Sequence, residues 1–171
     1  APQVRFMERS GFYRVWVPDT LVSPWEAWLA AAVVVQNSTS LKVGLGVTNP
    51  YTRHPVVMAQ TAAALQTLSG NRLTLALGKG LARFLEKIGI DPKDRALEEC
   101  AEILRRLTSG ERLDYPGKVF RLDGVRLRTS LPQKAIPIYL AAAGPNGWEK
   151  AVRFGDGVTC FWDDKLKETR D

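Results

Sequence analysis

The chain has 171 residues, of which 45% are hydrophobic, and it carries a formal net charge of +6. This length and composition suit one globular domain over residues 1–171. No apolar run reaches the roughly 20 residues that span a bilayer, which argues against a membrane protein. The basic residues are scattered among acids without interleaved aromatics, so the charge favours small anionic ligands over nucleic acid.

The two cysteines, Cys100 and Cys160, lie far apart, and the chain has one histidine. These counts argue against a Cys/His metal site and suit a reducing compartment. Residues 1–10 include three charges and no apolar centre, so they do not resemble a secretion signal. We therefore expect a cytoplasmic protein without a metal.

Strands and helices alternate in the first half of the chain. Ser23 to Glu26 has the spacing of a capping box, with Pro24 at the first helical position. Farther on, Met58, Ala62, Leu65 and Leu68 fall on one helical stripe. The expected elements are a helix at 4–10, a strand at 13–17, a helix at 24–35, a strand at 42–47, a helix at 55–68 and a strand at 72–77.

The alternation continues in the second half. Asp91 and Pro92 are typical of a helix start, and the helix that they predict has an apolar stripe and ends at Ser109-Gly110. Two short runs around 115–117 and 123–124 predict a hairpin. A strand at 136–141, a helix at 146–154 and a strand at 158–162 follow. This order predicts an α/β fold with a parallel sheet. The stripe consists of Leu97, Cys100, Ala101, Leu104 and Leu107.

Glycine-rich or small residues follow three of these strands, in the sequences GLGVTNP, LGKG and AAAGPNG. Ligands of parallel α/β folds bind at the carboxyl ends of strands. Glycine lets the backbone approach a flat ring or a phosphate, and a helix start offers free N–H groups to an anion. The three sequences together predict a cofactor cleft, although glycine also ends many strands for steric reasons alone.

The chain resembles the bacterial-luciferase-like superfamily, and within it the coenzyme F-420-dependent methylenetetrahydromethanopterin reductase branch. The resemblance lies in VWVPD, in GVTNPYTRHPVVMAQTAAALQTLSGNRLTLALGKG, in EILRRLTSGE with YPGKVFRLDGVRL, and in IPIYLAAAGP with GDGV. It implies a TIM barrel, a deazaflavin cofactor and hydride transfer at the deazaflavin ring.

The resemblance also implies roles for particular residues. The bond between Gly46 and Val47 matches a cis peptide that backs the ring, with the next two residues and Asp19 near the ring edge. The segments 78–80 and 141–145 would hold the phosphate. Each of these segments also has a rival interpretation. Residues 46–49 could form an ordinary strand-to-helix turn, residues 141–145 a plain helix start, Lys79 could be a solvated side chain, and Asp19 could belong to a turn or a cap. The candidate cofactor-binding residues are Asp19, Gly46, Val47, Thr48, Asn49, Gly78, Lys79, Gly80, Ala142, Ala143, Gly144 and Pro145.

No catalytic residue can be assigned from the pattern. His54, before a helix start, suits a structural role better than that of a base, and Asp156 suits a turn. Thr20 stands where many members of the superfamily have histidine after aspartate, so a family acid or base is missing. The reductases' first strand, which carries a catalytic carboxylate, also has no counterpart here.

The chain matches only the second to sixth strand units of the family's barrel, so the expected fold is an incomplete (β/α)8 TIM barrel. A whole barrel takes about 250 residues. The sequence is therefore either part of a longer protein or a degenerate barrel whose exposed edge strands associate, and we expect a homo-oligomer in the second case. Three functions stay open: an F-420-dependent oxidoreductase acting on a small molecule, an FMN-dependent monooxygenase, and a non-catalytic flavin-binding remnant.

Overall fold

A five-stranded parallel sheet forms the centre of the computed structural model, which describes residues 2–20, 23–80, 82–93 and 95–160. The strand order is β1-β2-β3-β6-β7, so each strand lies beside its neighbours in the chain once the β4–β5 hairpin is set aside. The sheet strands are β1 Arg14–Val17, β2 Lys42–Thr48, β3 Leu73–Leu77, β6 Ile138–Ala141 and β7 Gly157–Thr159. This topology confirms the predicted incomplete barrel of parallel strands.

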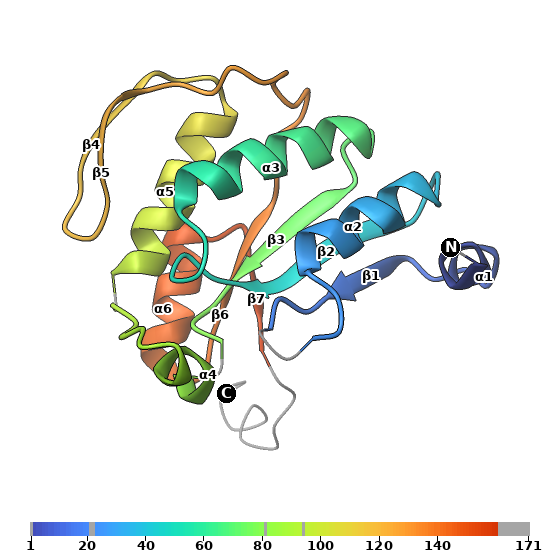
Figure 1. The fold of residues 1–171 in the computed structure, drawn as a ribbon, viewed down its shortest axis with the longest axis horizontal. Coiled ribbons are helices and arrows are strands. Elements are labelled where there is room, and N and C mark those ends of the chain that lie inside the picture. Colours follow the sequence, from blue (N-terminus) through green and yellow to red (C-terminus); the bar gives the residue numbers. More distant parts are fainter. Residues whose placement is uncertain (1, 21–22, 81, 94, 161–171) are drawn as a thin grey trace.

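Helices α2, α3, α5 and α6 lie along one face of the sheet, α1 lies beyond the amino end of β1, and α4 lies near the carboxyl ends of the strands (Figure 1). Crossover helices place their apolar faces against the sheet, as parallel strands require. The helices are α1 Pro2–Arg9, α2 Ala27–Gln36, α3 Pro55–Leu68, α4 Ala82–Lys87, α5 Ala96–Thr108 and α6 Pro145–Phe154. No described helix is long and apolar enough to cross a bilayer.

The core lies between the sheet and this helix layer. Val43 and Leu45 of β2 are buried with Met58 and Ala62 of α3 in one cluster. Alternate strand residues point to opposite faces, so these two β2 residues face the helices while the glycines between and after them face the other side. The predicted stripe of the 55–68 helix is confirmed at three positions but wrong at Leu68, which is 61% exposed because it ends the helix beyond the sheet.

Aromatic rings cover the second face of the sheet, which would be the inside of a complete barrel. The rings of Trp16 and Tyr139 lie 6.3 Å apart between centroids. A Cβ added at Gly46 would lie 2.7 Å from Trp16 Cε3, so the indole packs directly on the glycine backbone of β2. Packing of the indole therefore requires glycine at position 46, whatever the backbone conformation there.

Several predicted boundaries need correction. The 24–35 helix begins at Ala27, because the carboxylate of Glu26 accepts a hydrogen bond from Leu29 N and caps it, which leaves Pro24 outside. The helix predicted from Asp91 begins at Ala96. Helix α4 was not predicted, since its six residues are too few for a clear period. Strand β7 starts at Gly157, one residue before the predicted start. Residues 161–162 of its predicted range lie outside the described chain.

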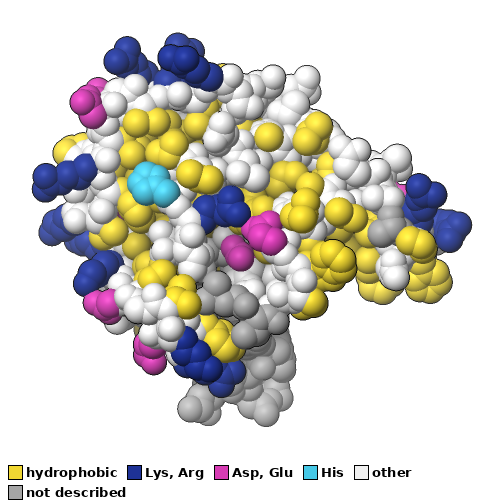
Figure 2. All heavy atoms as spheres, viewed as in Figure 1, with side chains coloured by type: hydrophobic (Ala, Val, Ile, Leu, Met, Phe, Trp, Pro, Cys, Tyr) yellow, Lys and Arg dark blue, Asp and Glu magenta, His cyan; other side chains and the backbone are white. Residues whose placement is uncertain are grey.

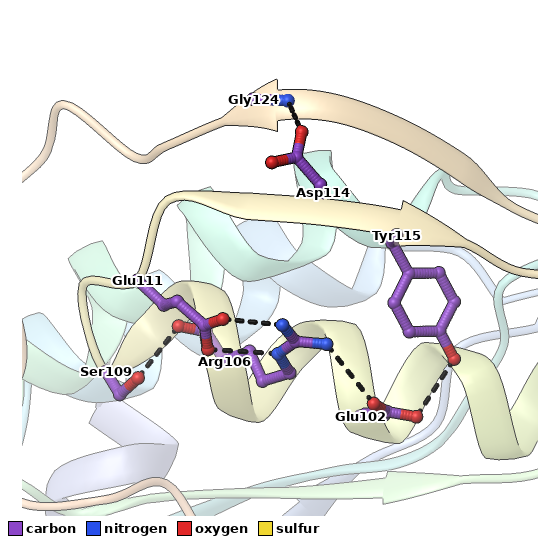
Figure 3. Close-up of polar contacts among 7 residues, drawn as sticks. All are labelled: Glu102, Arg106, Ser109, Glu111, Asp114, Tyr115 and Gly124. Atoms are coloured by element: carbon purple, nitrogen blue, oxygen red, sulfur yellow. Dashed lines mark hydrogen bonds and ion pairs between the residues drawn. The ribbon is translucent and has the colours of Figure 1, made fainter.

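The predicted hairpin is confirmed as β4 Leu113–Pro116 and β5 Arg121–Val125, an antiparallel pair. Figure 3 shows how α5 holds the start of the hairpin. Arg106 pairs with Glu102 and Glu111, and the hydroxyl of Tyr115 donates to Glu102 at 3.0 Å. The pairing raises the pKa of Arg106 and lowers that of Glu111. The hairpin is thus fixed to the helix layer by a network of charged hydrogen bonds.

A surface view of the same side shows hydrophobic side chains spread over the helix layer, with most lysine and arginine side chains at its margins (Figure 2). Half-exposed apolar residues of α2 and α3 contribute, among them Leu29, Val33 and Val57. Single apolar side chains of this kind are normal on a protein surface.

Candidate active site

A large cavity of about 1150 Å³ lies at the carboxyl ends of the strands. Asp19 after β1, Gly46 and Val47 of β2, and Ala142 and Ala143 after β6 all line it. The position agrees with the expectation that parallel α/β folds bind ligands at this edge. The volume exceeds the several hundred Å³ of an ordinary small-molecule site, so a ligand with a ring and a tail can fit.

The bond between Gly46 and Val47 is cis, as expected from the resemblance. Strand β2 is irregular at this point, since Gly46 pairs with Ala76 while Thr48 pairs with Leu77. Val47 is thereby left out of the register and lines the cavity.

Thr48 connects three strand ends. It is fully buried, and its hydroxyl donates to Asp19 Oδ2 at 2.6 Å, while its carbonyl accepts from Gly78 N at 3.0 Å. The ends of β1, β2 and β3 are thus held together by short-range hydrogen bonds. Thr48 therefore positions the carboxylate of Asp19 at the cavity wall without lining the cavity itself.

Asn49 follows as a buried residue that orders the next turn. Its side-chain oxygen accepts from Tyr51 N and Thr52 N at 3.0 Å each, which fixes the orientation of the amide. The amide nitrogen makes no hydrogen bond within the described chain, and the residue lines the cavity. A donor held in this way suits a carbonyl oxygen of a ring ligand.

Helix α6 begins at the same cavity without a side-chain cap. Its N-cap is Gly144, at φ +88°, and Pro145 takes the first helical position. A Cβ added at Gly144 would meet no atom within 4 Å, so the backbone there faces open space. An uncapped helix start is suited to an anion.

The cavity brings together eight of the twelve candidate residues, namely Asp19, Gly46, Val47, Asn49, Lys79, Gly80, Ala142 and Ala143. The other four, Thr48, Gly78, Gly144 and Pro145, do not line the cavity, although each is next in the chain to a residue that does. Gly78 packs closely behind it, since a Cβ there would lie 2.9 Å from Ala141 Cβ.

His54 and Asp156 lie outside the cavity. His54 caps α3 by accepting from Val56 N through Nδ1 at 3.3 Å, and its ring packs edge-on against Phe120, so the structural interpretation is confirmed. Asp156 lies in the expected bend, and it also accepts from Ile138 N at 2.8 Å and pairs with Arg105.

Sequence reasoning missed several cavity residues. Trp16, Phe84 of α4, and Arg95 and Glu98 at the start of α5 all line the cavity. The last two could have been found, because in a parallel fold each crossover helix starts at the edge where its preceding strand ends. Within the described ranges, no three His, Cys, Asp or Glu side chains gather to hold a metal ion.

A family model described as luciferase-like monooxygenase matches residues 1–171. The chain belongs to this family. Its curated relatives include 5,10-methylenetetrahydromethanopterin reductase of Archaeoglobus fulgidus, 32% identical over 91% of this chain and 46% of the relative. The F-420-dependent hydroxymycolic acid dehydrogenase of Mycobacterium tuberculosis is 37% identical over 88% of this chain and 45% of the relative. The chain thus spans about half the length of these proteins.

Solved structures of the family show the same fold. An F-420-dependent secondary alcohol dehydrogenase in complex with an F-420–acetone adduct superposes with a TM-score of 0.84, at 26% identity over 93% of this chain and 52% of that one. A riboflavin lyase with modified FMN superposes with a TM-score of 0.83 at 17% identity, a likeness of fold alone. Proteins with this fold thus include one named for F-420 and one solved with modified FMN.

Proposed function

We propose that the chain carries the cofactor site of an F-420-dependent oxidoreductase that transfers a hydride to or from a small molecule. The observation that supports this most is the cavity at the strand ends, lined by Asp19, the cis-linked Gly46 and Val47, and Asn49. The relatives support the choice of cofactor, because proteins named F-420-dependent are 37% and 34% identical to this chain over 88% and 78% of it.

The residues present fit a deazaflavin. At Gly78 a side chain would collide with Val47 Cβ at 3.0 Å, so the backbone just after β3 lies close to the residue that would back the ring. The fixed amide of Asn49 would donate to the ring edge. The segments 78–80 and 142–145 would hold the phosphate, with backbone N–H groups at the start of α6 and the ammonium of Lys79 near it. When bound, the deazaflavin would supply the hydride chemistry.

Asp19 would be the charged group of this chain beside the ring. Thr48 donates to one oxygen of its carboxylate, which holds that carboxylate in a fixed orientation at the cavity wall. Thr20 also lines the cavity but cannot act as an acid or base as histidine could. A proton at the substrate would therefore have to be handled by another group, and we assign no catalytic residue.

Two alternatives remain. An FMN-dependent monooxygenase is favoured by the description of the matching family as luciferase-like monooxygenase. A non-catalytic flavin-binding remnant is favoured by Thr20. Binding of F-420 or of FMN distinguishes the oxidoreductase from the monooxygenase. Turnover distinguishes both enzymes from the non-catalytic remnant.

We also propose that the two open edges of the sheet are covered in the working protein, by a second copy or by further polypeptide. Strands β1 and β7 end the sheet, and Trp16 and Val158 on them are 40% and 37% exposed. Open apolar edges invite association. Sedimentation of the 171-residue chain tests this, and a cooperatively melting monomer at micromolar concentration would contradict it.

Replacing Gly144 by leucine should weaken F-420 binding by about tenfold or more. A left-handed φ is strained for leucine, and its side chain would project over the N–H groups proposed to hold the phosphate, where hydrogen bonds to a charged group contribute about 1.5–3 kcal/mol. Titration of F-420, followed by its absorbance, measures the effect.

Gly11 provides the matched control. Its φ is +80°, and a Cβ there also meets nothing within 4 Å, but it lies before β1, at the opposite end of the sheet. Gly11→Leu should therefore carry a similar backbone strain and leave the affinity for F-420 unchanged. Equal affinity of Gly144→Leu and Gly11→Leu would count against the placement of the phosphate.

A further inference from the structure

A second pocket lies at the amino ends of the strands, at the opposite edge of the sheet from the candidate active site. Its volume is about 230 Å³. Four of its eleven lining residues are cations, and none of the eleven is an acid. The cations are Arg14, Lys42, Arg72 and Lys134. We call this the amino-end pocket.

Two of these cations face each other across neighbouring strands. Arg14 of β1 pairs in register with Lys42 of β2, so both side chains leave the sheet on the same face, the one that carries Trp16. Like charges directly opposite one another on a sheet are destabilising. Neither side chain forms an ion pair with any part of the chain that the structure describes.

Arg14 also lacks a hydrogen-bond acceptor. Its Nε is buried and has no partner within the described residues, while its guanidinium lies 5.2 Å from the ring centre of Trp16 and 5.6 Å from that of Tyr13. Buried donors almost always have partners, because desolvating one without an acceptor is costly. The two rings hold the guanidinium in place, and its unpaired Nε–H group indicates an anionic ligand.

The remaining walls of the amino-end pocket suit the same ligand. Thr74 of β3 is 2% exposed, faces the same side of the sheet, and its hydroxyl makes no hydrogen bond in the described part of the chain. Lys134 is held by its backbone, which donates to Asn71 Oδ1 at 3.2 Å and accepts from Gln66 Nε2 at 3.3 Å. Arg72 adds charge, although its own donors are occupied by backbone carbonyls and Ser38.

We propose that the amino-end pocket is a binding site for a small dianionic oxyanion of the phosphate class. Arg14, Lys42 and Lys134 supply the opposing charge, and the hydroxyl of Thr74 supplies a neutral donor. The bound oxyanion neutralises the two facing cations of β1 and β2 and therefore stabilises the edge of the sheet. The site is separate from the cofactor cavity and does not depend on the proposed function.

Calorimetric titration of the 171-residue chain with inorganic phosphate, against chloride at equal ionic strength, tests this proposal. Arg14→Gln and Lys42→Gln should each weaken phosphate binding by about tenfold, and Thr74→Val, which keeps shape and charge, by about threefold. Arg121→Gln removes an equal charge from the exposed strand β5 and should leave the affinity unchanged. A phosphate bound at the cofactor cavity would be the same in all four variants.

Three results would overturn the proposal. They are the absence of phosphate binding beyond the chloride control, an equal loss of affinity in Arg121→Gln and Arg14→Gln, and an unchanged affinity in Thr74→Val. The last variant keeps the assay decisive even where a charge change prevents folding, because valine replaces threonine at nearly the same volume inside a strand.

Discussion

Replacing Arg72 by methionine is expected to lower the free energy of unfolding by about 3–5 kcal/mol. Arg72 is 9% exposed, and its guanidinium donates to carbonyls at the end of α2 and before β2, including Leu41 O at 2.7 Å and Ser38 O at 2.9 Å. Burial lowers its pKa, and Glu8 nearby opposes that shift. Methionine fills similar space but leaves these buried acceptors without a donor.

Urea denaturation measures this loss, and two variants control for it. Arg121→Met on strand β5 removes an exposed arginine whose side chain forms no hydrogen bond or ion pair within the described chain, and it should change stability by less than about 0.5 kcal/mol. Arg72→Lys keeps the charge but not the planar set of donors, so its loss of stability should lie between those of Arg72→Met and Arg121→Met. A loss of under 1 kcal/mol for Arg72→Met would show that water replaces the guanidinium at these carbonyls.

The second large effect is expected at Gly44, in the middle of β2. A Cβ there would lie 2.6 Å from Trp16 Cδ2 and closer still to Cε3, so any side chain must displace the indole. Gly44→Val should cost about 2–3 kcal/mol of stability even though valine favours strands, because overpacking outweighs propensity. Trp16 lines the candidate active site, so F-420 affinity should fall as well.

The double variant Gly44→Val with Trp16→Ala separates collision from other causes. Removing the indole makes room for valine, so the double variant should be more stable than the sum of the two single losses predicts, by about 1–2 kcal/mol. Chemical denaturation of the four proteins completes the cycle. Additive losses would mean that the collision with Trp16 is not the reason for glycine at this position.

Much of the fold could be predicted because the chain shows clear local patterns. The helix at Pro55–Leu68 has its expected bounds, since a proline start, a regular stripe and a following Ser-Gly all agree. The start of α2 could not be found from its capping-box spacing, because Glu26 caps the helix with its own side chain and Pro24 stays outside.

The candidate active site divides in the same way. The glycine-rich strand ends were visible in the sequence, whereas the cis bond at Gly46-Val47 was expected only from the family resemblance. The hydrogen bond from Thr48 to Asp19 and the packing of Trp16 on the β2 glycines join residues about 30 positions apart. No local pattern records such contacts. The amino-end pocket was missed for the same reason, since its cations come from four separate segments.

Titration of the purified chain with coenzyme F-420, and separately with FMN, is the measurement that tests the proposed cofactor site most directly. Every residue assigned to the ring and the phosphate lies within the 171 residues, so the chain itself should bind F-420 saturably at one equivalent, and FMN should not saturate at the same concentrations. Saturation by FMN but not by F-420, or by neither cofactor, would contradict the assignment of a deazaflavin to this cavity.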